Sequence, residues 1–184
     1  IRDNNYLTKY IGGDWKYHNY RNYNIKNFYP AINQLLENNY TVFRMGKYVK
    51  EKININHPKF VDYPFTKQRS DFLDVYISSI CKFCVTTASG FDAIPYVFRK
   101  PLAFLHVPVG IFWTFSSKYF TITKHHYSKA LKRNLTLEEI FQNNLAYALK
   151  NSDFSDKKVK LIDNSPEEIV NLVTEMINFV ENKN

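Results

Sequence analysis

The residues best placed for chemistry form the run CVTTASGFDAIP, which begins at Cys84. The run reads as a buried strand, a tight turn of small residues and a short helix. A strand that enters a helix through Ser89 and Gly90 presents unpartnered backbone amides at a terminus where the helix dipole is positive. We therefore expect this turn to bind a phosphate-bearing ligand at the carboxyl edge of a parallel sheet.

Three residues of this turn are candidates for contact with that ligand, and each has an alternative explanation. The amide of Gly90 and the hydroxyl of Ser89 could donate to a diphosphate, although an ordinary turn needs glycine only for its backbone shape. The carboxylate of Asp92 is unfavourable beside a phosphate. It could contact a ribose or sugar hydroxyl, or it could cap the helix.

Two arginines outside the turn could add to an anion site. Arg44 ends a predicted strand, at the edge where an open parallel sheet binds its ligands. Arg69 precedes a predicted helix, where its guanidinium could fork onto phosphate oxygens, or it could be a solvated loop residue. Arg99 and Lys100 follow the short helix and are better explained as cations that offset its C-terminal dipole.

The densest polar cluster outside a helix is the run HNYRN that begins at His18. His18 could act as a general base that deprotonates an acceptor hydroxyl, and Arg21 could hold phosphate. The alternative is a loop that packs its tyrosines on the sheet. His125 and His126 are adjacent, so they cannot both face one site in regular structure. Since the chain also lacks a D-x-D carboxylate pair, we predict no metal.

Composition limits the classes of partner. The chain has 184 residues, a formal net charge of +8 and 45% hydrophobic residues, enough for the core of one domain. A basic chain suits a polyanion or a small acidic ligand. Its lysines are spread along the whole chain, without a dense basic block or a recognisable nucleic-acid-binding motif, so we expect no specific nucleic-acid binding.

Cysteine usage and hydropathy bear on the compartment. Cys81 and Cys84 have C-x-x-C spacing, but a single pair inside apolar sequence is best explained as two buried thiols, without a disulfide framework. No apolar run approaches the roughly 18 residues that a membrane span needs. We expect a cytoplasmic protein, either free or at the inner face of the membrane.

The hydrophobic periodicity predicts alternating helices and strands. Expected helices cover residues 29–38, 71–80, 92–98, 136–149 and 166–181, and expected strands cover 40–46, 59–63, 82–87, 102–107 and 158–162. Residues 108–135 are left unassigned; they include the aromatic run IFWTF from Ile111, either a platform for a base or acceptor or part of the core. This order predicts the α/β class, with a Rossmann-like open parallel sheet flanked by helices.

Several runs together resemble a poorly characterised family of bacterial glycosyltransferases, over residues 1 to about 140. They are YHNYRN from Tyr17, FRMG from Phe43, RSDFLD from Arg69, TASGFDAIP from Thr87 and FRKP from Phe98. The order of elements is also similar to the nucleotide-sugar-binding, C-terminal half of GT-B glycosyltransferases. The opening IRD is similar to the R-x-D arginine motif of fucosyltransferase-like members, which adds Arg2 to the candidates.

The resemblance implies one Rossmann-like donor-binding domain over residues 1–184, a fragment or half of a larger two-domain enzyme. It implies transfer of a sugar from a nucleotide-sugar to a glycan or lipid-linked acceptor, without a cofactor, with a missing N-terminal half as partner and peripheral membrane association. The candidate residues are then His18 and Arg21 for catalysis, and Ser89, Gly90, Asp92, Arg69, Arg44 and Arg2 for the donor diphosphate or nucleotide. A nucleotide-sugar epimerase-like enzyme and a non-catalytic basic binding domain are the alternatives.

Overall fold

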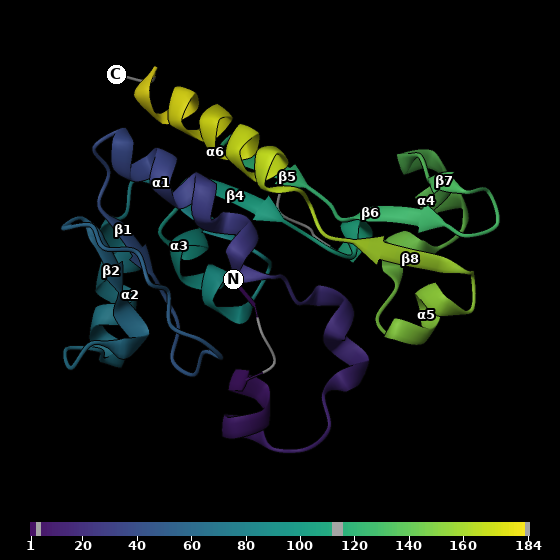
Figure 1. Ribbon diagram of the computed structural model, residues 1–184, viewed down its shortest axis with the longest axis horizontal. Helices are drawn as coiled ribbons and strands as arrows, with labels where there is room; N and C mark the ends of the chain where they lie inside the picture. Colours follow the sequence, from purple (N-terminus) through teal and green to yellow (C-terminus); the bar gives the residue numbers. More distant parts are fainter. Residues whose placement is uncertain (3–4, 112–115, 183–184) are drawn as a thin grey trace.

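The computed structural model describes residues 1–2, 5–111 and 116–182 and has a mixed α/β fold (Figure 1). Parallel strands flanked by helices confirm the α/β class, and this architecture is compatible with a Rossmann-like fold. Asp3 of the R-x-D motif and four residues of the aromatic run, 112–115, lie outside the described residues.

The central sheet is parallel and has the order β3-β4-β5, formed by Cys84–Thr86, Leu102–Leu105 and Tyr119–Ile122. The middle strand, β4, is buried along its whole length, as expected for a strand covered on both faces. Helix α3 (Ala93–Val97) connects β3 to β4, which confirms the predicted βαβ unit. A 3-10 turn, η5 (Gly90–Asp92), replaces the first turn of the predicted helix.

A second parallel pair lies apart from this sheet. Strand β1 (Val42–Arg44) pairs with β2 (Phe60–Asp62), in the register Val42 to Phe60. Helix α1 (Tyr29–Glu37) precedes β1, and α2 (Asp71–Ile80) follows β2 after a 3-10 turn, η4 (Tyr63–Phe65). These elements agree with the sequence prediction, except that the two strands are shorter.

The C-terminal third differs from the predicted parallel arrangement. Strands β6 (His125–Ser128), β7 (Arg133–Asn134) and β8 (Val159–Ile162) form an antiparallel sheet of order β7-β6-β8, at one end of the molecule (Figure 1). The helix expected over 136–149 was wrong in its length: α4 (Leu137–Gln142) stops early. Asn144 then takes a left-handed conformation, before a 3-10 turn, η7 (Leu145–Tyr147), and α5 (Asn151–Ser155).

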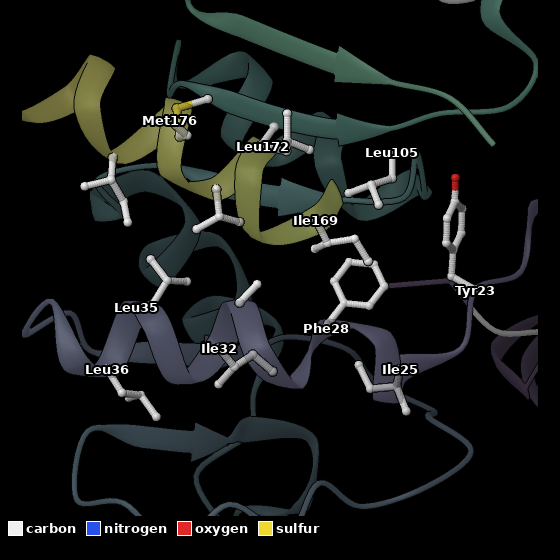
Figure 2. Packing of buried hydrophobic residues seen from close by; sticks show 14 of the residues in the cluster. Tyr23, Ile25, Phe28, Ile32, Leu35, Leu36, Leu105, Ile169, Leu172 and Met176 are labelled. Carbon is white, nitrogen blue, oxygen red and sulfur yellow. The ribbon is translucent and has the colours of Figure 1, made fainter. Parts of the chain in front are cut away.

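The main core lies between α1, the final helix α6 (Pro166–Glu181) and the central sheet (Figure 2). Ile32 and Leu35 of α1 and Ile169 and Met176 of α6 are buried there, near Leu105 of β4. A capping box at Ser165 and a proline in the first turn begin α6. No described helix combines the length and the apolar character needed to cross a lipid bilayer.

The N-terminal segment consists of three short turns, η1 (Leu7–Ile11), η2 (Lys16–Arg21) and η3 (Ile25–Phe28). Its anchor is Tyr20, whose ring lies 5.4 Å from that of Phe154 in α5, inside a second buried cluster. The amide of Tyr20 donates to Asn151 Oδ1 at 2.9 Å. The polar run that contains His18 and Arg21 is therefore fixed against the rest of the fold.

Candidate functional site

The turn after β3 has an unusual backbone, and the residue responsible is Ala88. It is buried and has φ +52°, a left-handed conformation that costs a non-glycine residue about 1–3 kcal/mol. Gly90, by contrast, does not adopt that conformation, and a Cβ built on it would meet no atom within 4 Å. The backbone conformation therefore does not require glycine at position 90. The open surroundings of Gly90 leave space for a ligand to approach the main chain.

Ser89 stands at the start of η5 with a hydroxyl that caps nothing. The two helical pieces that follow it are short, with three residues in η5 and five in α3. Such short pieces carry little helix dipole, so the dipole alone gives a weak anion site. Any strong attraction for an anion at this turn has to come from side chains.

Two arginines distant from the turn in sequence supply that charge. Arg21 Nη2 donates to the carbonyl oxygen of Ala88 at 2.6 Å, and the backbone amide of Arg2 donates to Thr87 Oγ1 at 2.6 Å. The structure thus brings Arg2 and Arg21 together beside the Ala88–Ser89 turn, at the carboxyl end of β3.

The two guanidinium groups repel one another. Burial and the positive charge of Arg21 together lower the pKa of Arg2 to about 10. Nε of both Arg2 and Arg21 is buried without a hydrogen-bond partner, and neither arginine has a carboxylate within ion-pair distance among the described residues. Two adjacent cations with unused donors form a site suited to an anion that carries more than one charge.

His18 lies next to this arginine pair. Burial and the charges of Arg2 and Arg21 together lower the pKa of its imidazole, so the ring is neutral at pH 7. The ring stacks on Trp15 at 6.0 Å and contacts Tyr17 at 4.1 Å, which fixes its plane. Its Nδ1 is buried without a hydrogen-bond partner in the described part of the chain. A neutral, oriented imidazole can accept a proton.

Asp92 lies on the other side of the turn and is buried. Burial raises the pKa of its carboxyl to about 6, although the charge of Arg21 opposes that shift. It makes no side-chain cap to the helix that follows, so the capping explanation for this residue is wrong. Its carboxylate is still charged at pH 7, within electrostatic reach of Arg21.

Sequence reasoning missed one residue of this cluster, His106. It follows β4 directly, is buried, and has a pKa lowered to about 4 by burial and by the charge of Arg21. Because β3 and β4 are parallel neighbours, the residues that follow both strands meet at the same sheet edge. The sequence did contain a signal for His106. It lies near the carboxyl end of the predicted strand 102–107, and the site residue Ser89 likewise follows the carboxyl end of a strand.

A buried lysine holds the segment that carries Arg21. Lys124 forms an ion pair with Asp163 at 2.7 Å, lies 4.1 Å from the centre of the Tyr23 ring and donates to the carbonyl oxygen of Asn22. Its side chain is 4% exposed, so the ammonium group of Lys124 is shielded from solvent. Lys124 is therefore a positioning residue that fixes the backbone immediately after Arg21.

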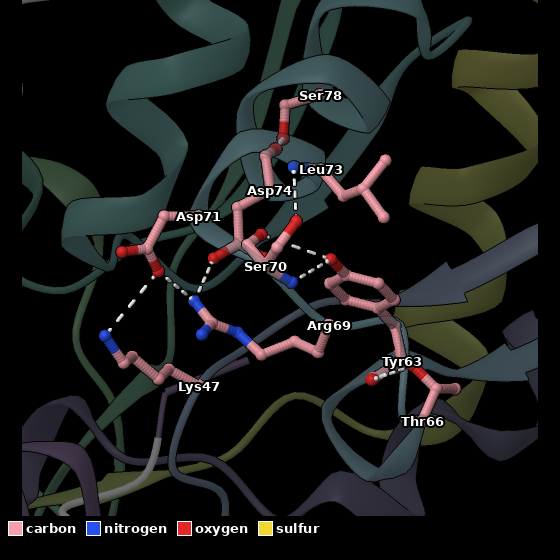
Figure 3. Close-up of polar contacts among 9 residues, drawn as sticks. All are labelled: Lys47, Tyr63, Thr66, Arg69, Ser70, Asp71, Leu73, Asp74 and Ser78. Carbon is pink, nitrogen blue, oxygen red and sulfur yellow. Dashed lines mark hydrogen bonds and ion pairs between the residues drawn. The ribbon is translucent and has the colours of Figure 1, made fainter.

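The structure places the other two candidate arginines in ion pairs of their own. Arg44 lies 3.1 Å from Asp62 across the β1–β2 pair, with both side chains buried, and it also donates to the Glu51 carbonyl. Arg69 donates to Asp71 at 2.6 Å and to Asp74 at 2.5 Å, in the first turn of α2 (Figure 3). Both guanidinium groups are thus bound to carboxylates of the chain itself.

The two cysteines and the two adjacent histidines have structural roles. Cys81 and Cys84 are free thiols, and burial raises the pKa of Cys84 to about 12. His126 points into the second core cluster, whereas His125 pairs with Glu168 at 2.8 Å, so the two rings diverge as expected for a strand. Among residues 1–2, 5–111 and 116–182, no three His, Cys, Asp or Glu side chains come together as a metal site.

Comparisons with family models, with curated proteins and with solved structures each found no match for this chain.

Proposed function

We propose that this chain is the donor-binding domain of a glycosyltransferase that transfers a sugar from a nucleotide-sugar to a glycan or lipid-linked acceptor. The observation that carries the proposal is the Arg2–Arg21 pair beside the turn after β3. The proposal also rests on the resemblance of the runs around Tyr17, Arg69 and Thr87 to bacterial glycosyltransferases, and on element order similar to the C-terminal half of GT-B enzymes.

The diphosphate of the donor binds to the two guanidinium groups and to the turn beside them. There the half-buried guanidinium groups of Arg2 and Arg21 and the hydroxyl of Ser89 donate to its oxygens. The main chain at Gly90 is open to close approach. Breaking the bond to the sugar leaves negative charge on the nucleoside diphosphate, and cations fixed beforehand by the fold stabilise that charge.

His18 takes the role of general base. Its lowered pKa keeps the imidazole able to accept the proton of an acceptor hydroxyl as that oxygen attacks the anomeric carbon. Trp15, which stacks on His18, also lines an open depression with Thr8, Gly13, Asp14 and Lys16. That depression offers an aromatic surface for the acceptor.

Ligand-dependent thermal stability tests the proposal, with UDP, GDP, CDP, ADP and CMP as probes. A ligand that binds only the folded chain adds about 2.7 kcal/mol at a hundredfold excess over its dissociation constant. We expect one nucleoside diphosphate to raise the melting temperature in the wild-type chain and in Arg69→Lys, but much less in Arg21→Lys. No shift with any nucleotide, or equal shifts in both variants, would overturn the assignment of this site.

A further inference from the structure

Helix α2 presents its apolar side to solvent. Phe72, Val75, Tyr76 and Ile80 are all exposed, and the ring of Phe72 stacks on that of Tyr76 at 6.0 Å. The inward side instead carries polar Asp74 and buried Ser78, beside Leu73 and Ile77. An ordinary surface helix has the opposite arrangement, with its apolar stripe toward the core. Helix α6 follows the ordinary rule, since its outward residues are Glu167, Asn171, Glu175 and Asn178.

Helix α3, which packs against α2, also exposes apolar side chains. Tyr96, Val97 and Phe98 are exposed at its C-terminal end, and Val97 is 72% exposed, close to the 74% of Phe72. We call these seven side chains, four on α2 and three at the end of α3, the α2–α3 surface. Large exposed apolar side chains gathered on two packed helices are typical of a contact site.

Cations gather at the sheet edge that adjoins the α2–α3 surface. Arg99, Lys100 and Lys118 precede β4 and β5, and the amide of Leu102 donates to the Lys118 carbonyl at 3.1 Å, which places them at the same edge. The charge of Lys100 also reaches Cys81 at the end of α2. In the part of the chain that the structure describes, none of these three cations has an ion-pair partner.

We propose that the α2–α3 surface, with Arg99, Lys100 and Lys118 at its edge, binds the face of an anionic lipid bilayer. Aromatic and aliphatic side chains on short helices enter the boundary between headgroups and acyl chains, and the flanking cations bind the anionic headgroups. Charge favours this occupant over a second copy, because the chain itself carries a net charge of +8. The arginine site lies at the opposite, carboxyl edge of the sheet, so this inference does not depend on the proposed transfer reaction.

Flotation with lipid vesicles tests this inference, with vesicles of phosphatidylcholine compared with vesicles that also contain phosphatidylglycerol. We expect the wild-type chain to bind only the anionic vesicles, and less as salt rises. Lys100→Glu/Lys118→Glu should weaken binding at least about tenfold, since each cation near the surface contributes about fivefold. Phe72→Ser/Val97→Ser should also weaken it at least about tenfold, through lost apolar burial.

Matched controls keep the test specific to this surface. Leu137→Ser removes an exposed apolar side chain of α4, and Lys160→Glu reverses an exposed charge of β8, so both should bind vesicles as the wild-type chain does. Circular dichroism of each variant confirms folding. Absence of flotation with anionic vesicles, or equal binding by the surface and control variants, would overturn the inference. Self-association in sedimentation that Phe72→Ser abolishes would assign the surface to a second copy instead.

Discussion

Four arginines of this chain were candidates for one anion site, and the structure divides them into two pairs. Arg44 and Arg69 form ion pairs with carboxylates: Arg44 lies 3.1 Å from Asp62, and Arg69 lies 2.5 Å from Asp74. Arg2 and Arg21 instead lie beside one another at the Ala88–Ser89 turn, where burial and the charge of Arg21 lower the pKa of Arg2.

The difference shows that the position of an arginine on a strand end or helix start does not decide its role. What decides the role is whether a carboxylate lies within reach. For Arg69 the carboxylates follow two and five residues later in the same helix turn. For Arg44 the carboxylate is in register on the neighbouring strand. Two guanidinium groups that lie side by side repel one another, so the pair does not stabilise the empty fold. The pair does concentrate positive charge where an anion can bind.

Removal of a paired arginine should give the largest effect on stability. Arg44→Ala leaves Asp62 buried without its cation, which should lower the free energy of unfolding by about 3–5 kcal/mol. Urea denaturation measures the change, and Lys16→Ala, which breaks an exposed pair with Asp14, should stay within about 0.5 kcal/mol of the wild type. A loss in Arg44→Ala no larger than in Lys16→Ala would remove the distinction between the two pairs of arginines.

Removal of an unpaired arginine should act on binding instead. Arg2→Gln relieves the repulsion with Arg21, so the free energy of unfolding without ligand should be unchanged or higher. Binding of the nucleoside diphosphate should weaken about tenfold to a hundredfold, because a charged hydrogen-bonding group is lost. Calorimetric titration and urea denaturation of the same variant give both numbers. Destabilisation of the empty chain with unchanged affinity would place Arg2 with Arg44 and Arg69.

Protonation of Asp92 should strengthen anion binding at the Arg2–Arg21 pair as pH falls. Its pKa of about 6 in the folded chain lies above the ordinary 3.8, so the carboxyl gains a proton as pH falls through 6. That proton removes a negative charge that repels the anion and competes for Arg21. Affinity for a nucleotide-sugar, whose esterified diphosphate keeps its charge over this range, should rise several-fold from pH 7.5 to 5.5. In Asp92→Asn the affinity should already be high at pH 7.5 and should no longer depend on pH. A pH dependence that persists in this variant would show that a group other than Asp92 causes it.

The smallest effect on the empty chain is expected at Gly90. Because a Cβ there meets nothing and the backbone is ordinary, Gly90→Ala should leave the free energy of unfolding within about 0.5 kcal/mol of the wild type. If the diphosphate approaches the main chain, the added methyl should still weaken its binding several-fold. Thermal melts with and without ligand separate the two effects, and an unchanged ligand-induced shift would place the ligand away from Gly90.

The sequence was sufficient for elements set by local pattern. The predicted starts of α4 and α6 agree with the structure, where Thr136 and Ser165 form capping boxes, and the apolar periodicity predicted α1 and α2. The end of α4 could not be read, since it depends on a left-handed Asn144 that local spacing does not reveal. The antiparallel pairing of β8 with β6 was also out of reach, because strand direction is set by contacts between distant segments.

The candidate site was predictable only where its residues are close in sequence. Ser89, Gly90 and Asp92 follow one strand, so the turn could be located from its residue types. Its charge comes from Arg2 and Arg21, which lie more than sixty residues away. The polar run at His18 suggested Arg21, and only the resemblance suggested Arg2. His106 was not predicted because it lies within an apolar run, where a single histidine is interpreted as one more core residue of the strand.

Titration of inorganic pyrophosphate by calorimetry tests whether the Arg2–Arg21 pair binds an anion, since this probe carries the diphosphate charge without base or sugar. We expect the wild-type chain and Arg69→Lys to bind pyrophosphate with equal affinity, and Arg2→Gln to bind it at least about tenfold more weakly. If the wild-type chain does not bind, or if Arg2→Gln binds as tightly as the wild type, the Arg2–Arg21 pair is not an anion site.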